Sequence, residues 1–243
     1  MRKRKKPAKS GGVRWWKWLL LFLALVFLVP IAQVGCVRVV DPPFTAPMIF
    51  HGSPRHYAWL DLREMPRDFL RFVLYAEDQR FLEHRGFDWR EISRARRDAI
   101  RVGREPRGAS TITQQCARSL FLWQGRSWIR KGLEAWYTVW MELLLPKRRI
   151  FELHANVVEM GDGIYGVQAA AQQHYGIPAR DLNRRQCATL AALLPAPSQW
   201  DPLHPSPAFS TRIERLLHHE QEAVLPEILV RTPVLHRLPE TRR

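Results

Sequence analysis

Residues 75–89 read Tyr75-Ala-Glu77-Asp78-Gln-Arg80-Phe81-Leu-Glu83-His84-Arg-Gly86-Phe-Asp88-Trp89. This stretch has helical periodicity, but it places a carboxylate where the pattern calls for an apolar residue. One inward-facing stripe is formed at helical spacing by Leu70, Leu74, Glu77, Phe81 and His84. We therefore expect Glu77 to be buried or to face a groove, where desolvation raises the pKa of a carboxyl toward the range useful for proton transfer. The alternative is a slightly rotated helix in which Glu77 belongs to a solvated polar edge.

Positive charge is concentrated at the N-terminus. The 243-residue chain has a formal net charge of +15, and 46% of its residues are hydrophobic, which is enough for a packed core. Eight basic residues and no acidic one precede Trp18: Arg2, Lys3, Arg4, Lys5, Lys6, Lys9, Arg14 and Lys17. Because the charge is gathered in one block, we expect no nucleic-acid partner. The three cysteines imply no disulfide framework, and Cys116 and Cys187 should be free core residues.

An uncharged run of 20 residues, Trp18 to Val37, follows the basic block. At 1.5 Å per residue it can cross a hydrocarbon core of roughly 30 Å. Nearby tryptophans suit a membrane interface, and the basic block predicts a cytoplasmic N-terminus with the remainder of the chain outside. We expect Pro30 not to end this helix, because the membrane leaves the backbone few alternatives.

A cleaved signal peptide is the alternative to an anchor. Gln33-Val34-Gly35-Cys36 has the outline of a lipoprotein cleavage site. However, Gln33 stands where such sites prefer an aliphatic residue, and no small-x-small site follows the apolar run. We therefore expect an uncleaved anchor.

Two helices are expected around the opening stretch, after a proline-rich, extended connector at residues 38–58. Met65-Pro66 opens the first helix, which should run through Glu77 to about His84. The second should cover about residues 89–102. Its arginines are most simply a solvated face, with an anionic membrane surface as the one partner considered: Arg90, Arg94, Arg96, Arg97 and Arg101.

A glycine-containing loop then runs into a helix at Arg107-Gly108-Ala109-Ser110-Thr111-Ile112-Thr113-Gln114-Gln115. Thr111 and Gln114 have the spacing of a capping box, so the helix should begin here and direct its unpaired amides at the loop. Such a helix end attracts phosphate, although a well-capped helix without a ligand has the same pattern. Four cations that follow closely favour an anion: Arg118, Arg126, Arg130 and Lys131.

Later elements have mostly structural interpretations. Arg130 and Glu134 can pair on one helix face, either as an ordinary ion pair or as part of a site. His154 and Asn156 lie on a helix that begins near Lys147, and they lack spaced metal partners, so we interpret them as structural.

Beyond residue 160 the sequence predicts close packing and then an exit from the core. Small residues at 161–171 follow no recognisable strand, which favours close helix packing over a dinucleotide site. A helix from about Arg184 to Leu194 precedes several prolines. The tail has one short amphipathic set and should be partly disordered: Ile213, Leu216 and Leu217.

Five ordered motifs resemble those of the peptidoglycan glycosyltransferases, glycosyltransferase family 51. They are Glu77-Asp-Gln-Arg-Phe81 with His84 and Gly86, Gly108-Ala-Ser-Thr-Ile-Thr-Gln-Gln115, Arg130-Lys-Gly-Leu-Glu134, the Lys147 to Asn156 helix, and Gly163-Ile-Tyr-Gly166 with Ala169-Ala-Ala171. Their order and spacing cover about residues 59–202. With no room after them for a transpeptidase domain, the chain resembles the monofunctional members of the family rather than the bifunctional penicillin-binding proteins.

The resemblance implies a mainly α, lysozyme-like domain beside the outer face of the bacterial inner membrane, which polymerises lipid II into β-1,4-linked glycan strands. In that family the glutamate that matches Glu77 is the general base for the acceptor's 4-hydroxyl, which attacks the anomeric carbon of the donor; undecaprenyl pyrophosphate leaves with inversion. Glu134 matches a second glutamate near the donor pyrophosphate or its metal. Residues that match substrate-binding positions, or lie close to them, are Ser110, Thr111, Gln114, Gln115, Arg118, Arg126, Arg130 and Lys131.

The implied organisation is a cytoplasmic basic segment (1–17), a transmembrane anchor (18–37), a connector (38–58), the glycosyltransferase domain (59–205) and a C-terminal tail (206–243). Implied partners are lipid II, the growing glycan strand, the membrane, and cell-wall synthesis or division proteins. No protein metal site is expected, although Mg²⁺ or Mn²⁺ could accompany the pyrophosphate.

Departures from the family pattern are few. Ala109, Arg118 and Leu133 replace more usual residues, and the 156–160 stretch lacks an aromatic, but both glutamates are present. A lysozyme-like glycan hydrolase and an inactive membrane-tethered scaffold are the alternative functions. The anchor and the clustered cations favour the lipid-linked donor.

Overall fold

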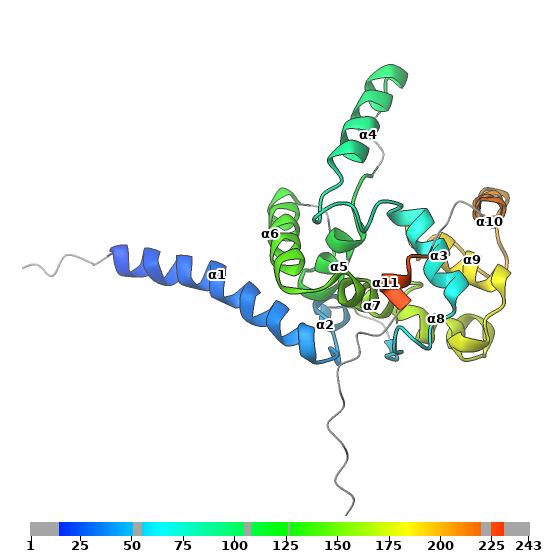
Figure 1. Cartoon of the computed structure of the whole chain (residues 1–243), viewed down its shortest axis with the longest axis horizontal. Coiled ribbons are helices and arrows are strands. Elements are labelled where there is room, and N and C mark those ends of the chain that lie inside the picture. Colours follow the sequence, from blue (N-terminus) through cyan, green and yellow to red (C-terminus); the bar gives the residue numbers. More distant parts are fainter. Residues whose placement is uncertain (1–14, 51–54, 105–107, 126, 220–224, 231–243) are drawn as a thin grey trace, which may run out of the picture.

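The computed structural model describes residues 15–50, 55–104, 108–125, 127–219 and 225–230. These residues form a mainly helical structure, as the sequence predicts (Figure 1). The elements, in chain order, are α1 (Trp15–Val39), α2 (Ala46–Phe50), β1 (His56–Tyr57), α3 (Arg67–Glu77), α4 (Trp89–Val102), α5 (Ile112–Phe121), α6 (Trp128–Leu144), α7 (Lys147–Val157), β2 (Ile164–Tyr165), α8 (Gly166–Tyr175), the 3-10 turn η1 (Ala179–Asp181), α9 (Arg184–Leu193), α10 (Pro207–His218) and α11 (Glu227–Val230).

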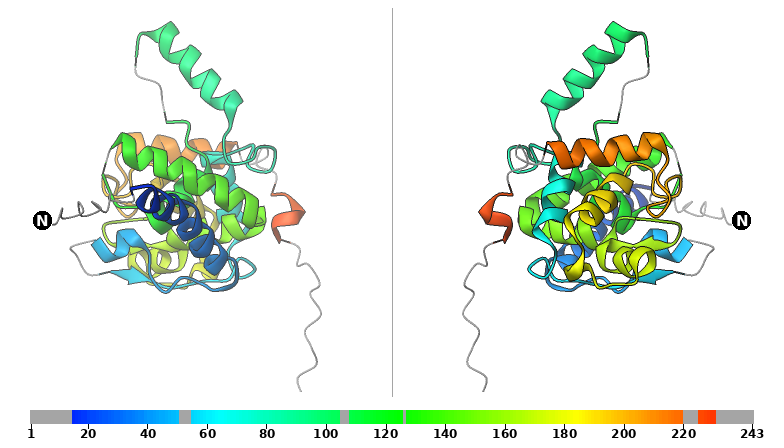
Figure 2. Two further views of the ribbon diagram at one scale, coloured as in Figure 1. Left: turned by 90° about the vertical axis from the view of Figure 1, so that its left-hand side faces the viewer. Right: turned by 90° about the vertical axis from the view of Figure 1, so that its right-hand side faces the viewer.

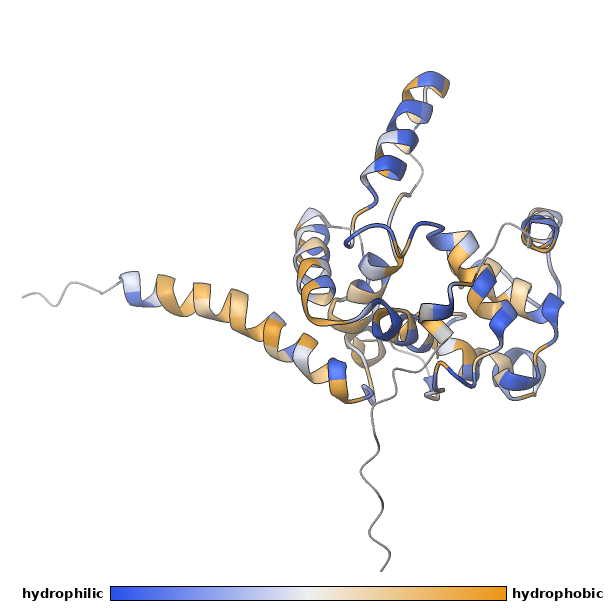
Figure 3. Cartoon of the chain, in the orientation of Figure 1, coloured by the Kyte–Doolittle hydropathy of each residue, from blue (hydrophilic) through white to orange (hydrophobic). Residues whose placement is uncertain are grey.

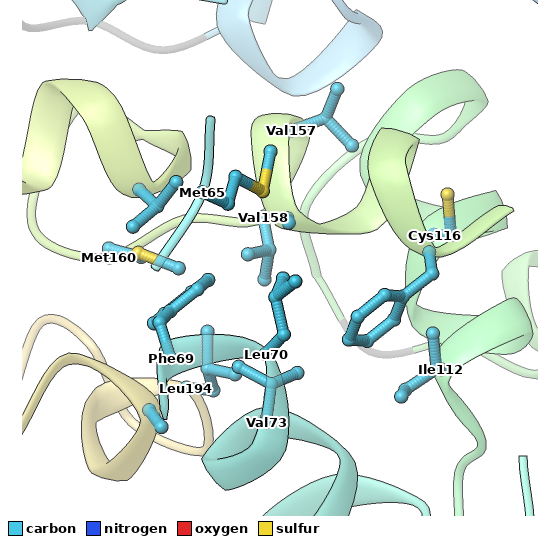
Figure 4. Packing of buried hydrophobic residues seen from close by; sticks show 14 of the residues in the cluster. Met65, Phe69, Leu70, Val73, Ile112, Cys116, Val157, Val158, Met160 and Leu194 are labelled. Carbon is cyan, nitrogen blue, oxygen red and sulfur yellow. The ribbon is translucent and has the colours of Figure 1, made fainter. Parts of the chain in front are cut away.

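Helix α5 forms the centre of the core, because it is enclosed by neighbours and most of its side chains are buried. It packs against α2, α6 and α7, while α3 packs against α9. Apolar side chains from α3, α5 and α7 meet in this core (Figure 4). Cys116 and Cys187 are buried free thiols, as expected. The site residues on α3 and α5 therefore stand on rigid, closely packed elements.

Helix α1 carries the apolar run and continues through Pro30, as predicted. It is the one described helix that is long and apolar enough to cross a membrane, with a mean hydropathy of 2.6. Its apolar surface is evident in Figure 3, where the helix extends away from the remaining elements. Its second half docks on α6: the Trp136 indole donates to the Val26 carbonyl at 3.0 Å, and the Phe27 and Trp136 rings meet edge to face.

The expected extended connector contains ordered structure. Within it lie α2 and β1, and β1 pairs in parallel with β2, matching His56 with Ile164 and Tyr57 with Tyr165. The pattern missed both elements because each is short and its partner lies far away in the chain. At the start of α8, a Cβ on Gly166 would lie 2.3 Å from the Asn156 carbonyl oxygen, so the small residue there does permit close packing.

Helix α3 ends at Glu77, and its expected continuation to His84 is wrong. The Asp78 carboxylate accepts hydrogen bonds from the Ile112 amide and from His84 Nε2, at 3.0 Å and 2.9 Å. These contacts turn the chain out of the helix, yet Phe81 and His84 are still buried. After the turn, Asp88 caps α4, which projects away from the other helices (Figures 1 and 2) and exposes its arginines.

Helix α10 belongs to the same core, so the expected boundary at residue 205 does not separate it from the domain. It packs against α9 and α3, with Phe209, Ile213 and Leu216 buried. The short amphipathic set expected in the tail is thus part of a 12-residue helix. Residues 220–224 and 231–243, to which the expectation of disorder also applies, lie outside the described residues.

Candidate active site

Glu77 is the last residue of α3, and its side chain is 10% exposed. Its burial follows from the helical stripe, because Leu70 and Leu74 on the same face are packed in the core. Desolvation raises the pKa of the Glu77 carboxyl, while Gln115, Arg212 and Arg118 each oppose that rise. The side chain thus has the environment expected of a proton acceptor: partly desolvated, yet stabilised as an anion by three neighbours.

Gln115 connects Glu77 to α5 and α7. Its Nε2 donates to Glu77 Oε2 at 2.8 Å, and its Oε1 lies 3.2 Å from His154 Nε2. His154 is fully buried on α7, and burial together with Arg118 lowers its pKa to about 3. The imidazole is therefore neutral at physiological pH.

Arg212 of α10 is a site residue that the sequence did not predict. Its guanidinium lies 3.4 Å from Glu77 Oε1, donates to the Ala192 carbonyl at 3.1 Å and stands over the Trp200 ring. The contact joins residues 135 positions apart. The one available signal was the neighbouring buried Ile213, which places Arg212 at the edge of an apolar helix face.

Glu134 is the second acidic group of the site and is 1% exposed. Its Oε2 accepts from Arg130 at 2.9 Å, and its Oε1 accepts from the Lys131 ammonium. Lys131 also donates to the Ser110 hydroxyl at 3.3 Å. The predicted ion pair is therefore present, but burial and the second cation make it more than an ordinary surface pair.

Arg118 interacts electrostatically with both Glu77 and Glu134. Burial lowers its pKa, and both Glu134 and Glu77 act to raise it. Together Arg118, Arg130 and Lys131 bring three positive charges to the single negative charge of Glu134. This surplus suits a multiply charged anion.

A cavity of about 410 Å³ opens beside these cations. Arg118 and Arg130 line it together with Glu159 and with residues of α2, β2 and the turn after α9, whereas Glu77 and Glu134 do not. Arg130 Nε is buried and has no hydrogen-bond partner among the described residues. Two guanidinium side chains thus line the cavity, and one of them has a buried N–H that no described residue accepts.

The start of α5 is a complete capping box rather than an open anion cradle. The Thr111 hydroxyl accepts from the Gln114 amide and donates to the Gly86 carbonyl at 2.6 Å, and the Gln114 side chain accepts from the Thr111 amide. The Ile112 amide is held by Asp78. Because these amides already have partners, the positive charge that suits an anion comes from the arginines. Arg126 lies outside the described residues.

The donors around Glu134 do not fit a divalent cation, because both carboxylate oxygens are bonded to cationic side chains. Among the described residues, one other group has metal-ligand chemistry: Asp78, His84 and Asp88, whose ligand atoms lie within 4.8 Å of one another. These side chains instead hold the loop after α3. Asp78 binds His84 and the start of α5, while Asp88 binds Arg80 at 2.9 Å and caps α4.

Residues 46–221 match the model of a family described as transglycosylase. The chain belongs to this family. It is 46% identical over 203 residues to a biosynthetic peptidoglycan transglycosylase of Xylella fastidiosa (strain 9a5c), covering 79% of this chain and 83% of that protein. A protein with the same name from Xanthomonas euvesicatoria pv. vesicatoria (strain 85-10) is 46% identical over 202 residues, covering 79% and 81%.

Membership of the transglycosylase family confirms the resemblance inferred from the five motifs. The match extends from α2 to beyond α10 and so includes Arg212 along with both glutamates. It supports an enzyme that transfers glycosyl groups, whereas the roles of single residues come from the geometry described above.

Proposed function

We propose that this transglycosylase is a peptidoglycan glycosyltransferase that joins lipid II units into β-1,4-linked glycan strands. One observation carries the proposal: Arg118 of α5 interacts electrostatically with the buried Glu77 carboxylate and with the cationic cluster around Glu134. An acceptor hydroxyl needs a base, and a pyrophosphate leaving group needs positive charge. The relatives' names agree with this substrate class.

Glu77 acts as the general base in this mechanism. Its carboxylate removes the proton from the 4-hydroxyl of the acceptor sugar as that oxygen attacks the anomeric carbon of the donor. The new C–O bond forms on the face opposite the leaving group, so the configuration inverts. Gln115 and Arg212 hold the carboxylate in place, with contacts at 2.8 Å and 3.4 Å.

The cationic cluster acts on the donor. As the anomeric C–O bond breaks, negative charge grows on undecaprenyl pyrophosphate, and Arg118 and Arg130 at the cavity wall stabilise it. Glu134 holds Arg130 and Lys131 in place and limits their mutual repulsion. Glu134 acts through these two cations and not as a metal ligand, because both of its carboxylate oxygens accept from them.

Helix α1 anchors the enzyme in the bacterial inner membrane, with its N-terminus cytoplasmic and the catalytic domain periplasmic. The docked half of α1 then brings α6 to the outer interface of the bilayer. In support, α6 exposes apolar side chains that suit this position: Trp128, Ile129, Val139 and Leu143. The cavity would thus open close to the membrane that supplies the lipid-linked donor.

Helix α4 extends this membrane-facing surface. Arg90, Arg94, Arg97 and Arg101 form one exposed stripe at helical spacing, and Trp89 and Ile100 beside it are 69% and 74% exposed. In Figure 1, α4 projects sideways relative to the direction of α1. An arginine stripe flanked by exposed apolar residues suits anionic headgroups, so α4 would lie along the bilayer surface.

Incubation of the detergent-solubilised full chain with lipid II tests the proposal. Wild type should give glycan polymer and free undecaprenyl pyrophosphate, whereas Glu77→Gln should give essentially none. Equal polymer from both proteins would remove Glu77 from the mechanism. Cleavage of preformed glycan strands without polymer would favour a hydrolase. No reaction with either substrate, from a protein that unfolds cooperatively, would favour a scaffold role.

A further inference from the structure

We propose that His154 is a positioning residue, which fixes the orientation of the Gln115 amide and thereby the hydrogen bond that Gln115 donates to Glu77. This inference rests on the proposed role of Glu77 as the base. The carrying observation is a continuous chain of two contacts, a buried one of 3.2 Å from His154 Nε2 to Gln115 Oε1 and a partly buried one of 2.8 Å from Gln115 Nε2 to Glu77 Oε2.

The chain has one consistent arrangement of protons. An ionised carboxylate can only accept, so Gln115 must present its NH₂ group to Glu77. The amide oxygen then faces His154, and an oxygen acceptor requires a donor. His154 must therefore carry its proton on Nε2, which leaves Nδ1 unprotonated. That nitrogen is buried and has no hydrogen-bond partner among the described residues, which suits the unprotonated state better than an unpaired N–H.

The surroundings of His154 keep its ring neutral. The ring is fully buried on α7, and the cationic Arg118 is near enough to disfavour a second proton. The imidazole thus stays neutral and continues to donate through Nε2 across the range in which an enzyme of this class would work.

Loss of the His154 donor would affect catalysis at one remove. Without this donor, the Gln115 amide can rotate by half a turn and lose no hydrogen bond to residue 154. The rotated amide would set its carbonyl oxygen against Glu77, so repulsion would replace a charge-assisted hydrogen bond. The base would then be less well oriented and harder to ionise. His154 itself touches neither substrate nor the reacting atoms in this account.

Two substitutions separate this role from simple packing. His154→Leu keeps an apolar group of similar size but has no donor, whereas His154→Gln keeps an N–H near the position of Nε2. We expect His154→Leu to lower kcat by roughly ten- to a hundredfold with little change in KM. The acidic limb of its kcat/KM profile should also move to higher pH, and His154→Gln should restore both properties in large part.

Coupling to Gln115 gives the sharpest outcome. In a Gln115→Leu background, His154→Leu should cause no further loss, because the amide through which it acts is gone. Independent, multiplicative losses would overturn the proposal, as would an unchanged pH profile in a folded His154→Leu protein.

The tautomer can be observed in the wild-type protein without an activity measurement. In ¹⁵N-histidine spectra of wild type, the histidine signals that disappear in His154→Gln should have the chemical shifts of the neutral Nε2–H tautomer throughout pH 5 to 8. An Nδ1–H tautomer or an imidazolium would overturn the proposal. Parallel lipid II assays of Glu77→Gln separate the proposed function from the inference about His154. Full activity of that variant would refute the assignment of Glu77 as the base, and it would leave the spectroscopic result unaffected.

Discussion

Removal of the Arg212 charge should make Glu77 harder to ionise. The two groups are 3.4 Å apart, and their side chains are 29% and 10% exposed. A unit-charge pair at that distance interacts by roughly 5 kcal/mol at an effective dielectric of 20 and by roughly 1 kcal/mol in bulk water. Partial exposure places this pair between those limits. Because this attraction favours the ionised carboxylate, its loss in Arg212→Gln should raise the pKa of Glu77.

The assay is the initial rate of lipid II polymerisation by the full chain between pH 5 and 9. A base must be deprotonated to act, so the acidic limb of kcat/KM should move to higher pH in Arg212→Gln. The variant should fall furthest below wild type at low pH and approach it at high pH. Arg212→Lys should show a smaller shift, because it keeps the charge but not the guanidinium geometry.

The control is Arg215→Gln, which removes an equal charge from the exposed side of α10 and should leave the limb in place. Urea unfolding of each variant measures the stability that is lost when Arg212 no longer contacts Ala192 and Trp200. An unmoved acidic limb in folded Arg212→Gln would refute the idea that this arginine tunes the base.

Three further predictions concern stability. Gly166→Ala should lower the free energy of unfolding by roughly 2–5 kcal/mol, because the φ of Gly166 is +79° and an added Cβ would meet a backbone carbonyl. The control is Gly176→Ala, which should cost only about 1 kcal/mol, because Gly176 has a φ of +69° but open space around the added Cβ. Equal losses of stability in urea titrations of the two variants would contradict the packing argument. The pKa of His154 is about 3 against an ordinary 6.5, so the unfolded state binds the extra proton between those values and stability falls with falling pH by up to about 1.4 kcal/mol per unit from this group. Unfolding of His154→Gln should show a shallower decline with pH; identical slopes would argue against a neutral buried histidine. Arg130→Met should cost roughly 3–5 kcal/mol by leaving Glu134 with one cation, and adding Glu134→Gln should recover part of that loss; no recovery would show that the arginine acts through packing alone.

Much of the candidate site could be predicted because its signals are local. The Thr111 and Gln114 capping box, the Arg130 and Glu134 spacing, and the stripe that buries Glu77 each lie within a few helical turns. Residues at such spacings meet in any helix, whatever surrounds it. The start of α5 could not be interpreted correctly from these signals, because they do not reveal that Asp78 already holds the Ile112 amide.

The amino-acid pattern alone established the mainly helical class, the apolar N-terminal helix and the order of motifs that leads to the transglycosylase family. Tertiary packing decided where α3 stops, how α1 docks on α6, and which groups surround Glu77. Asp78 ends α3 through a residue 34 positions away, and Arg212 reaches Glu77 across 135 positions. Helical periodicity shows which face of a helix is buried, whereas the partner on that face depends on how the whole chain folds back. The inward-facing Glu77 carboxylate could be identified from the sequence, but the groups that control its protonation become its neighbours only in the folded enzyme.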